Sequence, residues 1–185
     1  YGMADPRADV EVIALLWHIL HELGLPSLTL EINNLGQAAD REIYRPILVS
    51  YLKHHEAGLC GNCKHRIDAN PLRVLDCKVP ECRIITEQAP RLSESLSETA
   101  RSYFAQVLAG LDLIHIPYSL NHRLVRGLDY YNLTTFEVTA TNLGAQNAVG
   151  AGGRYDGLVE TLGGASTPAV GFAVGLERIA MLLPD

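Results

Sequence analysis

The chain has 185 residues, a formal net charge of −6 and a hydrophobic fraction of 48 %. This composition can supply a buried core and excludes wholesale disorder, and the apolar runs fall far short of the ~20 residues that cross a bilayer. The negative charge argues against a simple basic platform for nucleic acid, although a local basic face remains compatible with it.

The first part of the chain, residues 1–35, predicts a helix followed by a strand. Pro6 opens the helix with Asp5 as its N-cap, and Gly24 ends it. Residues 27–33 then alternate with a period of two, as in a half-buried strand. The apolar face of the helix has helical spacing and consists of Val12, Ile13, Leu16, Ile19, Leu20 and Leu23.

Residues 36–115 predict a helical insertion set into a strand-rich core. No stretch of this segment alternates as a strand would. One predicted helix, which Pro46 kinks or restarts, carries Ile43, Ile47, Leu48, Tyr51 and Leu52. A second predicted helix, over residues 97–113, carries Phe104, Val107, Leu108 and Leu111 on one face.

The last third, residues 116–185, returns to strands. Strands are expected near residues 116–120, 134–141, 147–151 and 167–174, with a turn at Gly152 and Gly153 and a helix that begins at Gly175. The gaps between these strands have the length of hairpins or loops, which is too short for helical crossovers. The predicted fold class is therefore α+β, a mostly antiparallel sheet with helices packed on it.

The four cysteines, Cys60, Cys63, Cys77 and Cys82, lie within 23 residues. A disulfide scaffold would spread its cysteines along the chain, and the start of the chain shows no secretory signal, so a cytoplasmic protein is expected. The spacing fits a four-thiolate zinc site, and a set of free, partly buried thiols is the alternative.

Residues 126–131 form the first of three patches that carry chemistry. They place a cation, an anion and two phenols next to Gly127. An arginine beside a permissive glycine can present a fixed fork to phosphate or carboxylate oxygens. The alternative is a surface turn with an Arg–Asp ion pair.

The other two patches are rich in glycine. Residues 151–157 contain three glycines that allow close approach of a ligand, and Tyr155 and Arg154 add a ring and a charge; a tight turn is the alternative. Residues 171–178 place small residues on a central strand, where they leave a flat floor for a planar ring. Arg178 opposes the dipole of the following helix, which suggests an anion nearby unless a neighbouring acid neutralises it.

Together the three patches resemble the histidyl-tRNA synthetases, a family of class II aminoacyl-tRNA synthetases. Residues 126–131 are similar to the histidine-specific motif of the family, residues 151–157 to its second histidine motif, and residues 171–178 to class II motif 3. Residues 70–76 (Asn-Pro-Leu-Arg-Val-Leu-Asp) resemble a stretch of the family's insertion. The resemblance runs along essentially the whole chain.

The resemblance implies a histidine–tRNA ligase, which activates L-histidine with ATP and Mg²⁺ and transfers it to tRNA-His. It implies a cytoplasmic homodimer that is not attached to a membrane. Arg126 would be the catalytic arginine at the α-phosphate and the carboxylate. The other site residues that it implies are Tyr131, Tyr155, Gly152 and Gly153 for histidine, and Arg178 and Gly175 for ATP.

In the family the insertion contacts the acceptor arm of tRNA. Residues 64–83 hold five basic and three acidic side chains, which allows contact with an RNA backbone; a solvated helical face is the alternative. No aromatic stacking array is visible there, so base-specific reading is not predicted.

The family's motifs 1 and 2, an earlier histidine-binding acid and the anticodon-binding domain have no counterpart in this sequence. We therefore expect a piece of the enzyme, the second half of the catalytic core (residues 1–35 and 116–185) plus the insertion, that cannot activate histidine by itself. The alternative is the synthetase-like regulatory subunit of ATP phosphoribosyltransferase, from histidine biosynthesis. The enzyme is favoured because paralogues of that kind typically lose parts of the reaction-specific set, which is present here.

Overall fold

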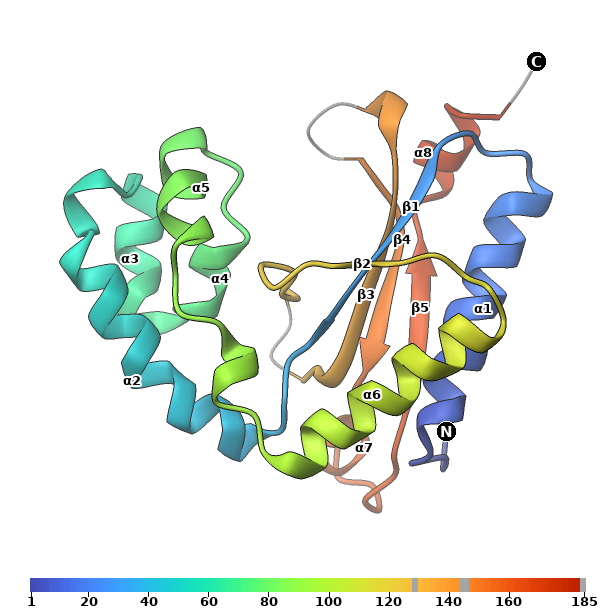
Figure 1. Cartoon of the computed structure of the whole chain (residues 1–185), viewed down its shortest axis with the longest axis horizontal. Helices are drawn as coiled ribbons and strands as arrows, with labels where there is room; N and C mark the ends of the chain where they lie inside the picture. Colours follow the sequence, from blue (N-terminus) through green and yellow to red (C-terminus); the bar gives the residue numbers. More distant parts are fainter. Residues whose placement is uncertain (128–129, 144–146, 184–185) are drawn as a thin grey trace.

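The computed structural model, which describes residues 1–127, 130–143 and 147–183, has two parts that lie side by side (Figure 1). One part is a sheet with long helices against it. The other is a group of shorter helices, here called the helical lobe, between residues 38 and 94. The candidate site lies where these two parts meet.

The sheet has five strands in the order β2-β1-β3-β4-β5. The pairing of β1 with β2 is parallel and the other three pairings are antiparallel, which confirms a mostly antiparallel sheet and the α+β class. Each strand lies in or near an expected stretch. The strands are β1 (Leu28–Asn34), β2 (Ser119–Leu120), β3 (Asn132–Ala140), β4 (Ala148–Arg154) and β5 (Val170–Val174).

Two expectations about the strands are wrong. The glycines at 152 and 153 do not form a turn but lie inside β4, which pairs with both of its neighbours there. A Cβ on Gly152 would lie 2.2 Å from the carbonyl oxygen of Gly171, so the glycine serves a close approach of strands rather than a change of direction. Strand β5 lies at the edge of the sheet formed by the described residues, not at its centre.

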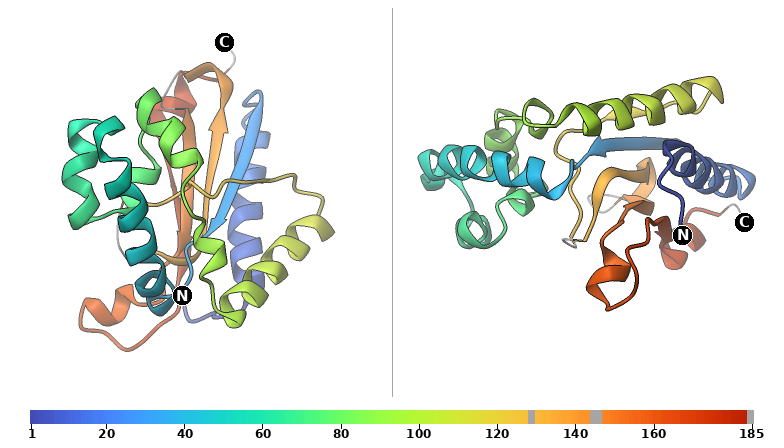
Figure 2. Two further views of the ribbon diagram at one scale, coloured as in Figure 1. Left: turned by 60° about the vertical axis from the view of Figure 1, so that its left-hand side comes forward. Right: turned by 90° about the horizontal axis from the view of Figure 1, so that it is seen from below.

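Two long helices, α1 (Pro6–Glu22) and α6 (Glu98–Leu113), pack against each other and against the sheet (Figure 2). The Asp5 carboxylate caps α1 by accepting a hydrogen bond from the Arg7 amide at 2.9 Å, as predicted. Ile19 and Leu23 were expected on the buried face but are each 39 % exposed. The core between these helices and the sheet contains Ile13, Leu16, Leu20, Val107, Leu111, Ile32, Phe136 and Val138.

The helical lobe has a hydrophobic core of its own. Its longest helix confirms the predicted helix and does not restart at Pro46, which lies inside it. It buries Tyr44, Leu48 and Leu52, whereas Ile43 and Ile47 are 60 % and 45 % exposed. The buried stripe recurs every four residues, so those two isoleucines fall on the solvent side. The lobe consists of α2 (Ala38–His54), η1 (Glu56–Gly58), α3 (Gly61–Ala69), α4 (Leu72–Leu75), α5 (Pro80–Glu87) and η2 (Leu92–Glu94).

The division between the two cores does not follow the chain in a simple way. Helix α6 falls within the predicted insertion, yet Val107 and Leu111 pack with α1 and the sheet. Conversely, Val125, in the loop before β3, and Leu133, the second residue of β3, are buried in the core of the helical lobe. The limits of the insertion stay a prediction.

Three short elements complete the described chain: η3 (Thr141–Leu143), α7 (Leu158–Thr161) and α8 (Leu176–Ala180). Within the described ranges, no helix is both long enough and apolar enough to cross a bilayer.

Candidate functional site

The guanidinium of Arg126 lies in the loop before β3 and forms an ion pair with Glu137 of that strand. Its Nη1 donates to Oε2 at 3.2 Å, and the two side chains are 20 % and 19 % exposed. The Nε of Arg126 is buried and has no hydrogen-bond partner in the described structure. Burial raises the pKa of Glu137, while Arg126 acts in the opposite direction. Arg126 is thus a half-buried fork with an unused donor, suited to an anionic ligand.

The predicted surface Arg–Asp pair within residues 126–131 is not tested, because Leu128 and Asp129 lie outside the described residues.

Three tyrosine rings gather beside Arg126. The ring centroids of Tyr130 and Tyr131 are 4.6 Å apart, and both rings meet Tyr155 edge-on at 5.9 and 6.0 Å. The Cζ of Arg126 lies 5.6 Å from the centroid of the Tyr131 ring, within reach of a cation–π contact. Burial raises the pKa of Tyr131 and raises that of Tyr155 to about 12, so both phenols are neutral near pH 7.

The family resemblance implied Tyr131 and Tyr155 for one pocket, and the structure brings the two rings together. Tyr130 had no predicted role, although it stands in the same motif. Its position next to Tyr131 in the chain was the feature of the sequence that could have placed Tyr130 in the site.

Gly152 and Gly153 of β4 face opposite sides of the sheet. A Cβ on Gly153 would lie 2.9 Å from the Tyr131 ring and 2.7 Å from the carbonyl oxygen of Thr134, so the missing side chain lets the ring approach. A Cβ on Gly152 would instead lie 2.6 Å from Phe136, in the core of the sheet. Only Gly153 therefore borders the tyrosine cluster.

Arg154, expected to offer its charge to a ligand, is a buried structural residue instead. Its side chain is fully buried and donates to Asp9 of α1, with the closest contact at 2.9 Å, and to Asp156 at 2.9 Å. The hydroxyl of Tyr103 donates to the same Asp9 carboxylate. Because Tyr155 stands between Arg154 and Asp156, this network holds the chain on both sides of the tyrosine.

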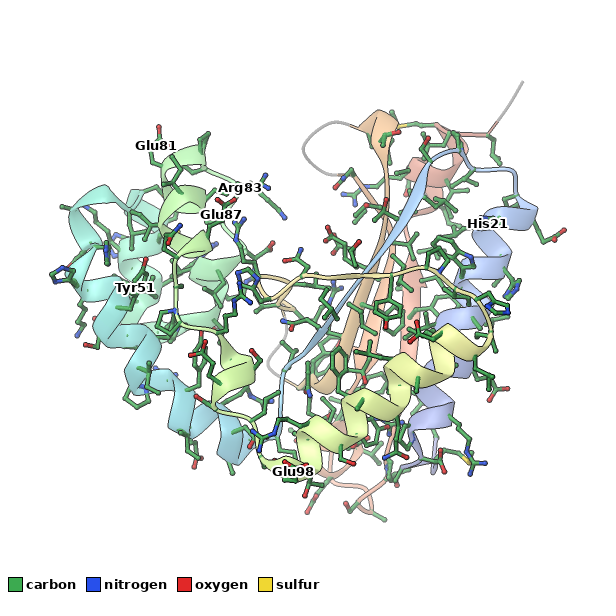
Figure 3. All side chains as sticks on the ribbon, in the orientation of Figure 1. His21, Tyr51, Glu81, Arg83, Glu87 and Glu98 are labelled. Atoms are coloured by element: carbon green, nitrogen blue, oxygen red, sulfur yellow. The ribbon has the colours of Figure 1, made fainter. Side chains whose placement is uncertain are left out.

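Among the cavities between the helical lobe and the sheet, two border the Arg126–Glu137 pair. The first, about 320 Å³, is lined on the sheet side by Arg126 and Tyr131 and on the lobe side by residues including Arg41 and Arg45. The second, about 340 Å³, has acidic and basic groups on both sides, among them Glu31, Asp76, Lys78, Arg83, Arg123 and Glu137. Figure 3 shows Arg83 and Glu87 on the side of α5 that is turned toward the sheet. The Arg126–Glu137 pair joins the two cavities.

Arg73 is a candidate site residue that the sequence did not single out. It lies on α4, and a Cβ on Gly127 would be 2.6 Å from its Nη1, so its guanidinium lies against the loop of Arg126. Its Nε is buried without a hydrogen-bond partner among the described residues. The signal available was a lone arginine in the apolar stretch 72–75, inside the segment that resembles the family's insertion.

Arg178 and Gly175 lie at the opposite end of β4 from the tyrosines. Arg178 donates to the carbonyl of Ala148, the first residue of β4, at 2.7 Å, and Gly175 donates to that of Val149 at 2.9 Å. Tyr155 follows the last residue of the strand, so the two ends are separated by roughly 23 Å at ~3.3 Å per residue. Glu137 of β3 pairs with Ala151 of β4, so it lies between the two ends of β4.

The structure brings together all four cysteines in the helical lobe. Cys60 precedes α3, Cys63 lies on α3, Cys77 follows α4, and Cys82 lies on α5. The four Sγ atoms lie within 4.8 Å of one another, and three of the residues are buried.

Comparisons with known proteins agree on one family. The model of the family described as "Histidyl-tRNA synthetase" matches residues 72–179. A histidine–tRNA ligase of Synechococcus sp. (strain RCC307) is 50 % identical over 184 residues, which is 100 % of this chain and 44 % of that relative. The chain thus spans less than half the length of this curated relative.

Solved structures share the fold. The crystal structure of apo S. aureus histidyl-tRNA synthetase matches with a TM-score of 0.76 and 38 % identity, over 98 % of this chain and 44 % of that one. A protein of Bacillus halodurans C, described as an ATP phosphoribosyltransferase regulatory subunit/histidyl-tRNA synthetase, matches with a TM-score of 0.64 and 23 % identity. That match covers 100 % of this chain and 52 % of the other, and it supports the fold alone.

Proposed function

Because this chain belongs to the histidyl-tRNA synthetase family, we propose that it forms the part of a histidine–tRNA ligase in which histidine meets ATP. The observation that carries the proposal is the order of groups along β4. The tyrosine cluster lies at the end of the strand, the Arg126–Glu137 pair at its middle, and Arg178 at its start.

This order matches the geometry of adenylate formation. The carboxylate of histidine attacks the α-phosphorus of ATP, and pyrophosphate leaves on the far side. The amino acid therefore needs a pocket at one end of the site, the α-phosphate needs a cation in the middle, and the remaining phosphates need a cation beyond it.

Each group has a role that its surroundings support. Neutral phenols of Tyr131 and Tyr155 would contact the imidazole of histidine without competing for its carboxylate. The fork of Arg126 would bridge the carboxylate and the α-phosphate. Arg178 would contact the terminal phosphate, with Gly175 in the adenine floor and Mg²⁺ entering with ATP. Gly153 would shape the base of the histidine pocket, whereas Gly152, which the resemblance also implies there, faces the core of the sheet.

The remaining assignments concern the whole protein. The chain spans 44 % of the Synechococcus ligase, so we propose that it needs the rest of the enzyme to activate histidine. The acceptor arm of tRNA-His would contact the basic residues of segment 64–83 in the lobe. The complete enzyme would be a cytoplasmic homodimer.

A chimeric ligase tests the proposal. The chain replaces the matching 44 % of the Synechococcus ligase, and histidine-dependent ATP–pyrophosphate exchange is measured for the chimera and for the isolated chain. We expect exchange in the chimera only. Exchange by the isolated chain would contradict the need for the remaining part.

A folded chimera without exchange would contradict the ligase and favour the regulatory paralogue. Circular dichroism and a thermal transition similar to that of the parent ligase establish folding in that comparison.

A further inference from the structure

The cysteine cluster of the helical lobe has the dimensions of a metal site. Its four Sγ atoms lie within 4.8 Å of one another, and those of Cys60 and Cys77 are 3.9 Å apart. Zinc bound by four thiolates at ~2.3 Å in a tetrahedron separates its sulfurs by about 3.8 Å. The side chains thus already surround a space of the size that one zinc ion needs.

Neither a disulfide nor an iron–sulfur cluster fits these four sulfurs as well as zinc does. A disulfide needs two sulfurs about 2.05 Å apart, and all four cysteines are free. An iron–sulfur cluster places several iron and sulfide atoms between its thiolates and needs them farther apart. Apolar packing alone does not require four sulfurs from three separate helices and their flanks to point at a common centre.

We propose that Cys60, Cys63, Cys77 and Cys82 bind one structural Zn²⁺ as four thiolates. The four thiol protons pass to solvent as the metal binds, which leaves a centre of formal charge −2. The surroundings favour that charge. The amide of Cys60 donates to the Sγ of Cys82 at 3.2 Å, and the guanidinium of Arg123 donates to the carbonyl of Cys77 at 3.4 Å.

The metal would add a fixed centre to a hydrophobic core that is built from short helices. Helices α3, α4 and α5 contain nine, four and eight residues, too few for helices that are stable in isolation. The zinc would join the start of α3, the end of α4 and the first turn of α5. It does so in the core that also buries Val125, next to Arg126.

A direct contact extends this support toward the site. Arg123 bonds the carbonyl of Leu75 at 3.2 Å as well as that of Cys77, and it stands three residues before Arg126. The zinc centre would therefore fix the lobe side of the loop that carries Arg126. This consequence for activity rests on the proposed function, whereas the metal site itself does not.

Metal content tests the proposal directly. The 185-residue chain is purified from zinc-supplemented medium under reducing conditions, and zinc is counted by elemental mass spectrometry. We expect about one zinc per chain in the wild type and less than a tenth of that in Cys63→Ser and Cys82→Ser. The matched control is His65→Ala, an exposed histidine on α3, which should keep its zinc.

Three outcomes would overturn the proposal: a wild-type chain without zinc, full retention of zinc in a cysteine variant, or loss of zinc in His65→Ala. If the cysteine variants fail to fold, the wild type is tested alone. Removal of the metal by a chelator should lower the Tm by about 10 °C or more, and added Zn²⁺ should restore it. Cobalt substitution should show the intense visible bands of a tetrahedral tetrathiolate. An unchanged Tm, or a colourless cobalt sample, would contradict the proposal whether or not the ligase is active.

Discussion

Removing the charge of Asp9 should strongly destabilise the protein, because the Arg154 guanidinium would lose its main buried partner. Both side chains are fully buried, and Nε and Nη2 of Arg154 donate to the Asp9 carboxylate at 2.9–3.2 Å. Breaking such a pair by removing one partner costs about 3–5 kcal/mol. Arg154 keeps Asp156 and the carbonyl of Met3, so for Asp9→Asn we expect the lower end, about 3 kcal/mol.

Urea unfolding followed by circular dichroism measures this loss. With a slope of about 2 kcal/mol per molar urea, the midpoint should fall by about 1.5 M. The matched control is Arg7→Ala, which breaks the Asp5–Arg7 pair of the same helix. Arg7 is 89 % exposed, so almost no change in the urea midpoint is expected. A loss below about 1 kcal/mol in Asp9→Asn would refute the reasoning.

Three further predictions concern the site and its surroundings. Arg126→Lys in the chimeric ligase should lower the pyrophosphate-exchange rate by about 100-fold or more, since lysine keeps the charge but not the fork; a rate within threefold of the parent would contradict its role. Gly153→Ala should raise the KM for histidine at least about tenfold, because the Cβ of the alanine would lie 2.7 Å from a backbone oxygen. The control is Gly157→Ala, where a Cβ meets open space, and it should leave the KM unchanged. The pKa of His122 is lowered by burial, so the unfolded chain takes up the proton first as the pH falls below about 6.5. Stability should then fall between pH 7 and pH 5.5 by up to about 1.4 kcal/mol per pH unit, and His122→Asn should flatten that slope in urea titrations.

Local pattern was enough to predict the long elements of the fold. The helices over residues 6–22 and 98–113 have apolar residues at helical spacing, and their caps or stops lie within a few residues of their ends. The period-two alternation of β3 indicates which residues face each side of the sheet. Gly152 was misread because a glycine pair looks alike whether it permits a turn or a close approach. Only the position of β5 distinguishes these two cases.

Long-range partners limited the prediction of the site. Arg154 was expected to meet a ligand because its partner Asp9 lies 145 residues earlier in the chain, and no local pattern connects the two. Arg73 was missed for the same reason, since its neighbour Gly127 belongs to a distant loop. The four cysteines, in contrast, lie close enough in sequence to suggest one site.

The burial of Val125 and Leu133 in the core of the helical lobe limits how modular this protein can be. An engineered deletion that joined β1 directly to α6 would keep the strands and both long helices. It would also strip the support from both sides of the loop that carries Arg126. A lobe exchanged between relatives would need its partner residues at 125 and 133 to be exchanged with it. In an engineered variant, the lobe and the loop that carries Arg126 should therefore be exchanged together.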